Sequence, residues 1–151
     1  PKVIEFNCRF GDPETQPVML RLESSLVLLI EAAFAKALDK VEAQWDPRPS
    51  LGVVLAAGGY PGDYAKGDAI SGLDAAAKIE GKVFHAGTSL KDGQVVTNGG
   101  RVLCATAMGS TVADAQQQAY RLAKEVSWNG SFYRTDIGYR AIARERGEHQ
   151  Q

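Results

Sequence analysis

The clearest indication of the fold is KVFHAGTSLKDGQVVTNGGRVLCATAM, residues 82–108. It contains three short runs with the composition of strands, Lys82–Thr88, Gln94–Thr97 and Arg101–Met108. Asn98-Gly99-Gly100 separates the last two, and Asn and Gly tolerate the positive φ that tight hairpin turns require. The spacing therefore predicts antiparallel strands joined by short turns, with a hairpin at Asn98–Gly100.

The segments on either side of these residues are expected to add one strand and three helices. Leu51–Ala57 is typical of a buried strand, and Leu73–Ile79 has room for a short helix. Thr111 is suited to cap the next helix. That helix is expected to run to about Val126, because apolar residues recur along it at helical spacing. A last helix is expected over Ile137–Arg146, capped by Thr135 or Asp136, before a polar tail that we expect to be disordered. These segments predict an α+β domain, a mostly antiparallel sheet with flanking helices, from about residue 47.

The first part of the chain has a different pattern. Val3–Cys8 alternates apolar and polar residues, as a half-buried strand does. Gly11 and two prolines place a loop over Arg9–Pro17, and Pro17–Leu22 is either a short helix or an extended connection. Ser24 or Ser25 then caps a long helix expected to run to about Val41.

Composition excludes several classes of function. The 151 residues carry 17 basic and 18 acidic side chains, a net charge of −1, so neither nucleic acid nor an anionic membrane is an expected partner. The longest apolar run is too short to cross a bilayer. Two cysteines, Cys8 and Cys104, are interpreted as reduced thiols of a cytoplasmic protein, although the sequence does not exclude a disulfide between them. The two histidines form no ligand cluster with them, so zinc is not expected.

Two carboxylate-bearing segments near the start carry the candidate chemistry. Glu5 and Asn7 lie two apart on the predicted strand, so they point the same way and offer hard oxygen ligands suited to Mg²⁺. Arg9, Asp12 and Glu14 follow in the loop, where they suit a zwitterionic or phosphate-bearing ligand. The simpler interpretation of Glu5 and Asn7 is a solvent-facing strand. That of Arg9, Asp12 and Glu14 is a solvated turn.

The run EFNCRFGDPETQ, residues 5–16, resembles the signature of phosphoribosylamine–glycine ligases at the end of their ATP-grasp domain. Four later stretches also resemble that family, in the family's order: Ser50–Asp63, Gly81–Thr88, Val95–Leu103 and Tyr133–Arg140. The resemblance implies three parts: residues 1–22 as the end of the ATP-grasp domain, 23–46 as a connecting helix, and 47–151 as the C-terminal α+β domain.

The resemblance also implies a reaction. These ligases use ATP to convert glycine to an acyl phosphate, which 5-phosphoribosylamine attacks to give glycinamide ribonucleotide, ADP and phosphate, in purine biosynthesis. Glu5 and Asn7 match the positions that bind Mg²⁺ (or Mn²⁺) on the ATP phosphates. Arg9 would stabilise the transferred group. Asp12, with Glu14, would hold the ammonium end of glycine, because a carboxylate beside the reacting end would repel it.

The second domain is expected to close one side of that site. Candidates are Gly58 and Gly59 in the loop that continues to Tyr60-Pro61, Arg101 with the preceding Asn98–Gly100, and Arg134. The glycines would allow close approach of the backbone to a ligand, and the arginines would meet a ribose phosphate. Turns and surface ion pairs are the simpler interpretation. His85 is expected to be a packed strand residue rather than a base.

The family's enzymes carry a further N-terminal portion, with most of the ATP-grasp core, that this chain lacks. We therefore expect these 151 residues alone to be inactive, with that portion as their partner. Two other interpretations stay open: a different ATP-grasp carboxylate–amine ligase or carboxylase, and a non-catalytic module for packing or dimerisation.

Overall fold

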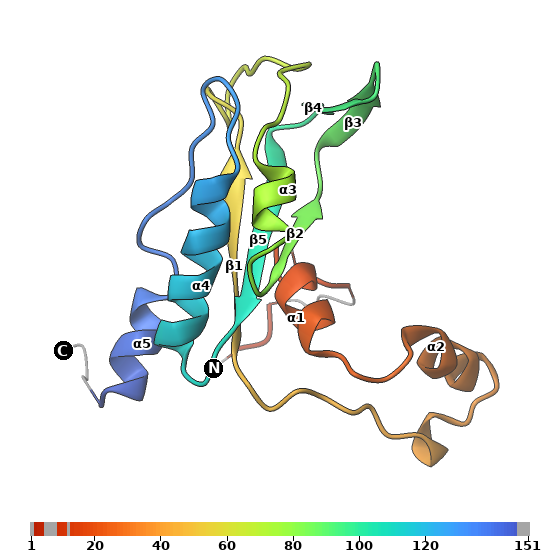
Figure 1. Cartoon of the computed structure of the whole chain (residues 1–151). Helices are drawn as coiled ribbons and strands as arrows, with labels where there is room; N and C mark the ends of the chain where they lie inside the picture. The colour runs from red at the N-terminus through yellow and green to blue at the C-terminus, as the bar shows by residue number, and fades with distance from the viewer. Residues whose placement is uncertain (1, 5–8, 12, 148–151) are drawn as a thin grey trace.

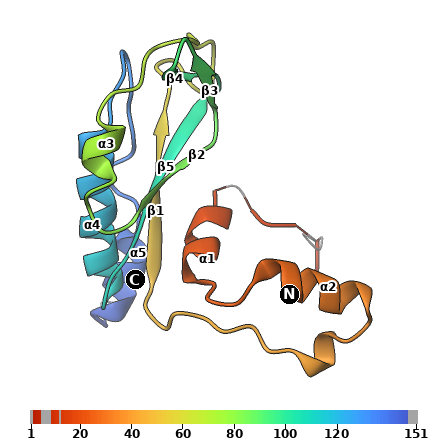
Figure 2. The ribbon, with the colours of Figure 1, turned by 45° about the vertical axis from the view of Figure 1, so that its right-hand side comes forward.

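A three-stranded antiparallel sheet forms the centre of the computed structural model, which describes residues 2–4, 9–11 and 13–147. Its strands are β1 (Ser50–Ala56), β5 (Arg101–Met108) and β2 (Lys82–His85), in the order β1-β5-β2. Helices cover both faces of this sheet, with α4 on one side and α1 on the other (Figure 2). The predicted α+β class, an antiparallel sheet with flanking helices, is confirmed.

The hydrophobic core lies between the sheet and α4 (Val112–Glu125). Leu51, Val53 and Leu55 alternate along β1 toward this side and are almost fully buried, as is Leu122 of α4. Thr111 caps the helix as predicted: its hydroxyl accepts the backbone N–H of Asp114 at 3.1 Å, and the Asp114 carboxylate accepts the N–H of Thr111 at 3.2 Å. This capping box satisfies two N–H groups that the helix itself leaves without acceptors.

The opposite face of β1 carries smaller residues and receives α1 (Thr15–Arg21). The Ser50 hydroxyl donates to the carbonyl of Pro17 at 2.7 Å. A Cβ on Gly52 would lie 2.9 Å from Cys104 Sγ and 3.1 Å from Pro17 Cγ, so the helix can approach the strand this closely only over glycine. The helical alternative for Pro17–Leu22 is thus correct, and the helix begins two residues earlier.

The hairpin predicted at Asn98–Gly100 is wrong. β3 (Thr88–Lys91) instead pairs with β4 (Gln94–Thr97), through a turn at Asp92 and Gly93 with φ of 49° and 78°. Both central residues therefore adopt the positive φ that favours a two-residue hairpin. Asn98–Gly100 links this ribbon to β5, which pairs with β1 and β2.

The predicted strand Lys82–Thr88 is interrupted where the ribbon leaves the sheet. A Cβ on Gly87 would lie 2.8 Å from the Cα of Gly99, so the two backbones touch there without intervening side chains. The N–H of Asn98 donates to the carbonyl of Gly87 at 2.7 Å. The predicted strand therefore ends at His85, and only its last residue, Thr88, belongs to a strand again, as the first residue of β3.

Residues 23–44 form a side loop that extends away from the sheet after α1 and returns before β1 (Figure 1). It contains α2 (Leu26–Phe34) and the 3₁₀ turn η1 (Leu38–Lys40). Ser25 caps α2 as predicted, accepting the N–H of Leu28 at 3.4 Å.

The helix expected to continue to Val41 instead ends at Phe34, because Lys36 adopts a φ of 55°. The N–H groups of Lys36 and Ala37 then donate back to the carbonyls of Ala33 and Ala32. This is the pattern of a Schellman motif, with lysine at the position that glycine usually takes.

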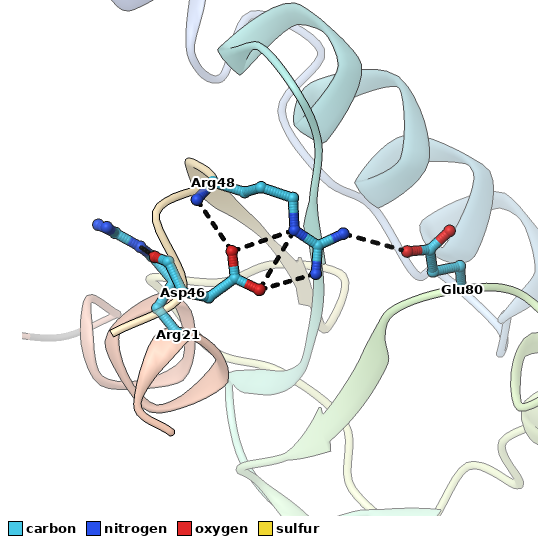
Figure 3. A network of polar contacts seen from close by, with 4 residues as sticks. All are labelled: Arg21, Asp46, Arg48 and Glu80. Carbon is cyan, nitrogen blue, oxygen red and sulfur yellow. Dashed lines mark hydrogen bonds and ion pairs between the residues drawn. The ribbon is translucent and has the colours of Figure 1, made fainter. Parts of the chain in front are cut away.

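The base of the side loop is closed by an antiparallel bridge between Leu22 and Trp45. Beside it, the backbone N–H of Asp46 donates to the carbonyl of Arg21, and the Arg21 guanidinium donates to the carbonyl of Asp46. The Asp46 carboxylate also accepts from the Arg48 guanidinium at 2.8 Å, and Arg48 reaches Glu80 at 3.6 Å (Figure 3). Hydrogen bonding to Arg48 lowers the pKa of Asp46 from 3.8 to about 2.

The remaining helices are short. α3 (Leu73–Ala76) lies within the range predicted for it, and α5 spans Tyr139–Glu145. The caps predicted for the last helix, Thr135 and Asp136, are wrong: Gly138 takes that position with a φ of 86°. Asp136 is held by Arg134 instead.

At the start of the chain, Val3 and Ile4 are exposed and belong to none of the described strands. The rest of the strand predicted over Val3–Cys8 lies outside the described residues, as does most of the polar tail.

Candidate functional site

A groove of about 350 Å³ lies on the face of β1 away from the core. Alternate residues of that strand form its floor, and loops from three other parts of the chain form its walls. The lining residues are Pro13, Gly52, Val54, Ala56, Tyr60, Arg101, Phe132, Tyr133, Arg134 and Ile137. The groove is therefore largely apolar and aromatic, with two guanidinium groups, a combination that suits an anionic ligand with an organic body.

Arg101 enters the groove from the start of β5, opposite Ala56. The pairing of β1 with β5 shifts register between Leu55 and Ala56, and such irregularities redirect side chains. The guanidinium carbon of Arg101 lies 5.9 Å from the centroid of the Tyr60 ring, within the range of a cation–π contact.

The position of the Tyr60 ring depends on the glycine beside Arg101. Gly100 is buried, and a Cβ there would overlap the ring of Tyr60 and lie 3.0 Å from that of Tyr64. The ring centroids of the two tyrosines are 6.3 Å apart. The predicted glycine segment Asn98–Gly100 thus makes room for an aromatic wall of the groove.

Arg134 forms the other cationic wall. Its Nε and Nη2 atoms donate to the two oxygens of Asp136 at 2.8 and 2.6 Å. These hydrogen bonds raise the pKa of Arg134 and lower the pKa of Asp136, so both groups are charged at neutral pH. The carbonyl of Arg134 accepts from the Tyr120 hydroxyl of α4 at 2.8 Å, which ties this segment to the core helix.

The predicted loop residues lie partly within the described chain. Arg9 is exposed, and its guanidinium donates to the carbonyl of the neighbouring Phe10 at 2.9 Å. Glu14 is exposed at the start of α1, where its carboxylate accepts the N–H of Gly11 at 2.5 Å. Glu5, Asn7 and Asp12 lie outside the described residues. Their roles, and those of Arg9 and Glu14, stay predictions.

The two glycines predicted to bind substrate lie in the exposed loop after β1 and do not line the groove. A Cβ on Gly58 would lie 2.9 Å from the carbonyl oxygen of Gly130, and Gly59 has a φ of 93°. Both positions therefore require glycine for the path of the loop itself. Whether their backbone also contacts a ligand stays a prediction.

His85 ends β2 as an exposed residue, so the expectation that it is packed is wrong. Its Nδ1 lies 3.1 Å from the Thr88 hydroxyl, and it does not line the groove. Cys104 is buried, with Sγ 3.4 Å from the Thr106 hydroxyl. Cys8 lies outside the described residues, so the predicted state of the two thiols is untested.

Phe132 and Tyr133 also line the groove, although neither is among the candidate site residues predicted from the sequence. Phe132 is placed by a bridge in which its N–H and carbonyl both bond to Ala56 of β1. A usable signal was the small size of Gly52 and Ala56, since small residues on one face of a strand indicate the close approach of another segment.

The described ranges contain neither a cluster of metal ligands nor a membrane-spanning helix. Among these residues, no three His, Cys, Asp or Glu side chains lie together as ligands for a metal ion. In the same ranges, none of the helices has the length and apolar character that crossing a bilayer requires.

Comparison with known proteins assigns the chain to a family. The family model described as phosphoribosylglycinamide synthetase, C domain, matches residues 50–140. Over all 151 residues the chain is 95% identical to the phosphoribosylamine–glycine ligase of Pseudomonas putida, covering 35% of that protein. It is 68% identical over 148 residues to the Vibrio cholerae ligase, covering 98% of this chain and 34% of that protein.

A crystal structure of the Thermotoga maritima phosphoribosylamine–glycine ligase superposes with a TM-score of 0.64 at 37% identity, over 90% of this chain and 33% of that one. The chain thus spans about a third of the length of the relatives that it matches. The matched C-domain model includes β1, β5 and both arginines of the groove. The chain therefore belongs to the phosphoribosylglycinamide synthetase family and corresponds to the C-terminal part of its enzymes.

Proposed function

We propose that this chain is the C-terminal part of an enzyme that joins glycine to 5-phosphoribosylamine with ATP, through a glycyl phosphate, in the purine pathway. The observation that carries the proposal is the groove. Pro13 belongs to the stretch that resembles the ligase signature, and it lines the same groove as Arg101 and Arg134 of the matched domain. The end of the signature loop and two cations thus share one surface.

The charges of the substrates give each part of this surface a role. The glycine carboxylate must approach an anionic triphosphate, and two unit charges 4 Å apart repel by roughly 4 kcal/mol at an effective dielectric constant near 20. We assign Arg9 to offset that repulsion and Asp12, with Glu14, to hold the glycine ammonium group. Arg101 and Arg134 would bind the phosphate of phosphoribosylamine, and the ring of Tyr60 would limit the space for its ribose.

The metal assignment rests on Glu5 and Asn7, whose carboxylate and amide oxygens are the donors that Mg²⁺ or Mn²⁺ prefers. Bound there, the metal would neutralise charge on the ATP phosphates. Gly58 and Gly59 are kept as candidates for backbone contact with substrate. We place the reaction in the cytoplasm, in keeping with a reduced state of Cys104 and Cys8.

The proposal is tested by ADP release from a full-length enzyme that carries this chain, with phosphoribosylamine generated in place. An Asp12→Asn variant should raise KM for glycine, and an Arg101→Gln variant should raise KM for phosphoribosylamine. Each variant loses a hydrogen bond to a charged group, so we expect KM to rise by about 10- to 100-fold for that one substrate only. Arg121→Gln is the matched control, because Arg121 is an exposed arginine of α4, on the other face of the sheet.

The rival interpretations give different results. ADP release that ignores glycine and responds to bicarbonate or formate would assign the chain to another ATP-grasp ligase or carboxylase. If the full-length enzyme responds to none of these substrates, the remaining interpretation is a non-catalytic module for packing or dimerisation. The 151 residues alone should release no ADP, and measurable release by them would contradict the dependence on the preceding portion.

A further inference from the structure

The side loop exposes an apolar stripe on α2, formed by Val27, Ile30 and Phe34. These residues are three and four positions apart, so they lie on one face of the helix. Their exposed fractions are 63%, 46% and 85%. Leu38 and Val41, which follow the helix in the side loop, are also apolar and exposed, at 54% and 42%. A contiguous surface of this kind marks an interface, whereas single exposed apolar residues are ordinary.

The composition of α2 also indicates, independently of the exposed stripe, that this helix forms an interface. Its nine residues, LVLLIEAAF, include one charged side chain, Glu31. A helix that is apolar on nearly all sides is buried in the protein to which it belongs. Within the described chain only Ala32 of this helix is buried. The surface that would cover the rest of α2 is therefore not supplied by the described residues.

The stripe is also held in a defined position. The N–H of Glu23 donates to the carbonyl of Gln44 at 3.0 Å, and the N–H of Gln44 donates to the Ser24 hydroxyl at 2.7 Å. With the Leu22–Trp45 bridge, these contacts fix both ends of the side loop beside α1. A surface ordered before it meets its partner loses less conformational entropy on contact.

We propose that the stripe Val27–Ile30–Phe34 packs against the part of the family enzyme that precedes residue 1. This chain covers 35% of the Pseudomonas putida ligase, so about two thirds of such an enzyme lies outside it. The segment arriving from that part exposes Val3 and Ile4, at 74% and 96%. The side loop lies on the same side of the sheet as α1, the helix through which that segment enters (Figure 2).

The size of the stripe separates this occupant from a second copy of the chain. A nine-residue helix is about 14 Å long, at roughly 1.5 Å per residue. A stable complex of two separate proteins buries about 800 Å² on each partner, more than one face of so short a helix provides. A covalently attached segment needs no such area, because its effective concentration is in the millimolar range.

The test is thiol labelling in a full-length enzyme that carries this chain at its C-terminal end, with Phe34→Cys as the reporter. Its labelling should be about 100-fold or more slower in the native enzyme than in urea, because burial in a stable interface blocks the reagent. The labelled peptide is identified by mass spectrometry, so native thiols do not interfere. Leu90→Cys is the matched control: Leu90 is also apolar and exposed, at 74%, in the β3–β4 ribbon (Figure 1).

Three outcomes decide the proposal. Protection of Phe34→Cys that does not change on dilution, while Leu90→Cys labels rapidly, supports it. Protection that disappears on dilution assigns the stripe to contact between copies and overturns it. Labelling of Phe34→Cys as fast as in urea also overturns it. Val27→Cys, on the same stripe, repeats the measurement if the first variant does not fold.

Discussion

The sheet domain and the side loop place apolar residues of similar size in opposite environments. Leu122 of α4 is fully buried between the helix and β1, whereas Leu28 of α2 is 63% exposed. Both helices begin with a hydroxyl cap, so their local start signals are alike. What differs is the surface available to each helix within this chain. The sheet domain therefore buries its apolar residues within this chain, whereas the side loop has an ordered backbone but leaves most apolar residues of α2 exposed.

The largest expected effect comes from removing core volume. Leu122→Ala in the 151-residue chain should lower the free energy of unfolding by about 2–5 kcal/mol, because it leaves a cavity in a fully buried site. Leu28→Ala should change it by less than about 0.5 kcal/mol. Urea unfolding followed by circular dichroism measures both. Equal losses for the two variants would show that α2 is packed in this chain and would remove the contrast.

A second variant tests how closely α1, which precedes the side loop, approaches the sheet. Gly52→Ala should destabilise the chain by about 1–3 kcal/mol, because the new Cβ would crowd Cys104 Sγ and Pro17 Cγ. Cys104→Ala should relieve part of this loss when the two changes are combined, and a double-mutant cycle measures that coupling. Strict additivity of the two changes would mean that the crowding lies elsewhere.

The caps of α4 and α2 are expected to differ in their contribution to stability. Thr111→Ala should cost about 1 kcal/mol of stability, since it removes one half of a capping box on a helix that holds the core. Ser25→Ala should cost less than about half of that, because its hydrogen bond to the N–H of Leu28 is long and α2 packs on little. Thermal unfolding of both variants measures the difference. A larger loss for Ser25→Ala would contradict the view of α2 as a weakly coupled element.

The smallest effect concerns the base of the side loop and depends on pH. The pKa of Asp46 is about 2 in the folded chain against an ordinary 3.8, so its contact with Arg48 stabilises the fold above about pH 4. That contribution is lost as the pH falls from about 4 to about 2. The thermal midpoints of wild type and Asp46→Asn should therefore converge over this range. A difference between them that stays constant with pH would show that Asp46 does not act through its charge.

Much of the sheet domain could be predicted from the sequence because local signals agree with packing there. The apolar run of β1 and the Thr111 cap of α4 both specify the observed elements. The prediction failed where two turn signals compete. Asn98-Gly99-Gly100 and Asp92-Gly93 each favour a hairpin, and strand pairing, which is not local, selects Asp92-Gly93.

The side loop was harder to predict for a related reason. The helix signal continues past Phe34, and the chain turns at Lys36, a residue that rarely adopts positive φ. Nothing in the sequence marks that position. In the groove, Arg101 and Arg134 were among the predicted candidates because a guanidinium group is suited to bind a ribose phosphate. Phe132 and Tyr133 were missed because their role depends on a bridge to Ala56, a contact between residues distant in sequence.

The bridge between Leu22 and Trp45 has a consequence for the path of the chain. Because the two ends of the side loop pair there, the backbone leaves α1 and returns toward β1 only about 5 Å away, the spacing of paired Cα atoms in antiparallel strands. The sheet domain and α1 therefore do not depend on what lies between the two bridge residues. A short turn in place of the side loop would preserve the route from α1 to β1, so this segment can change in length or sequence independently of the fold that carries it.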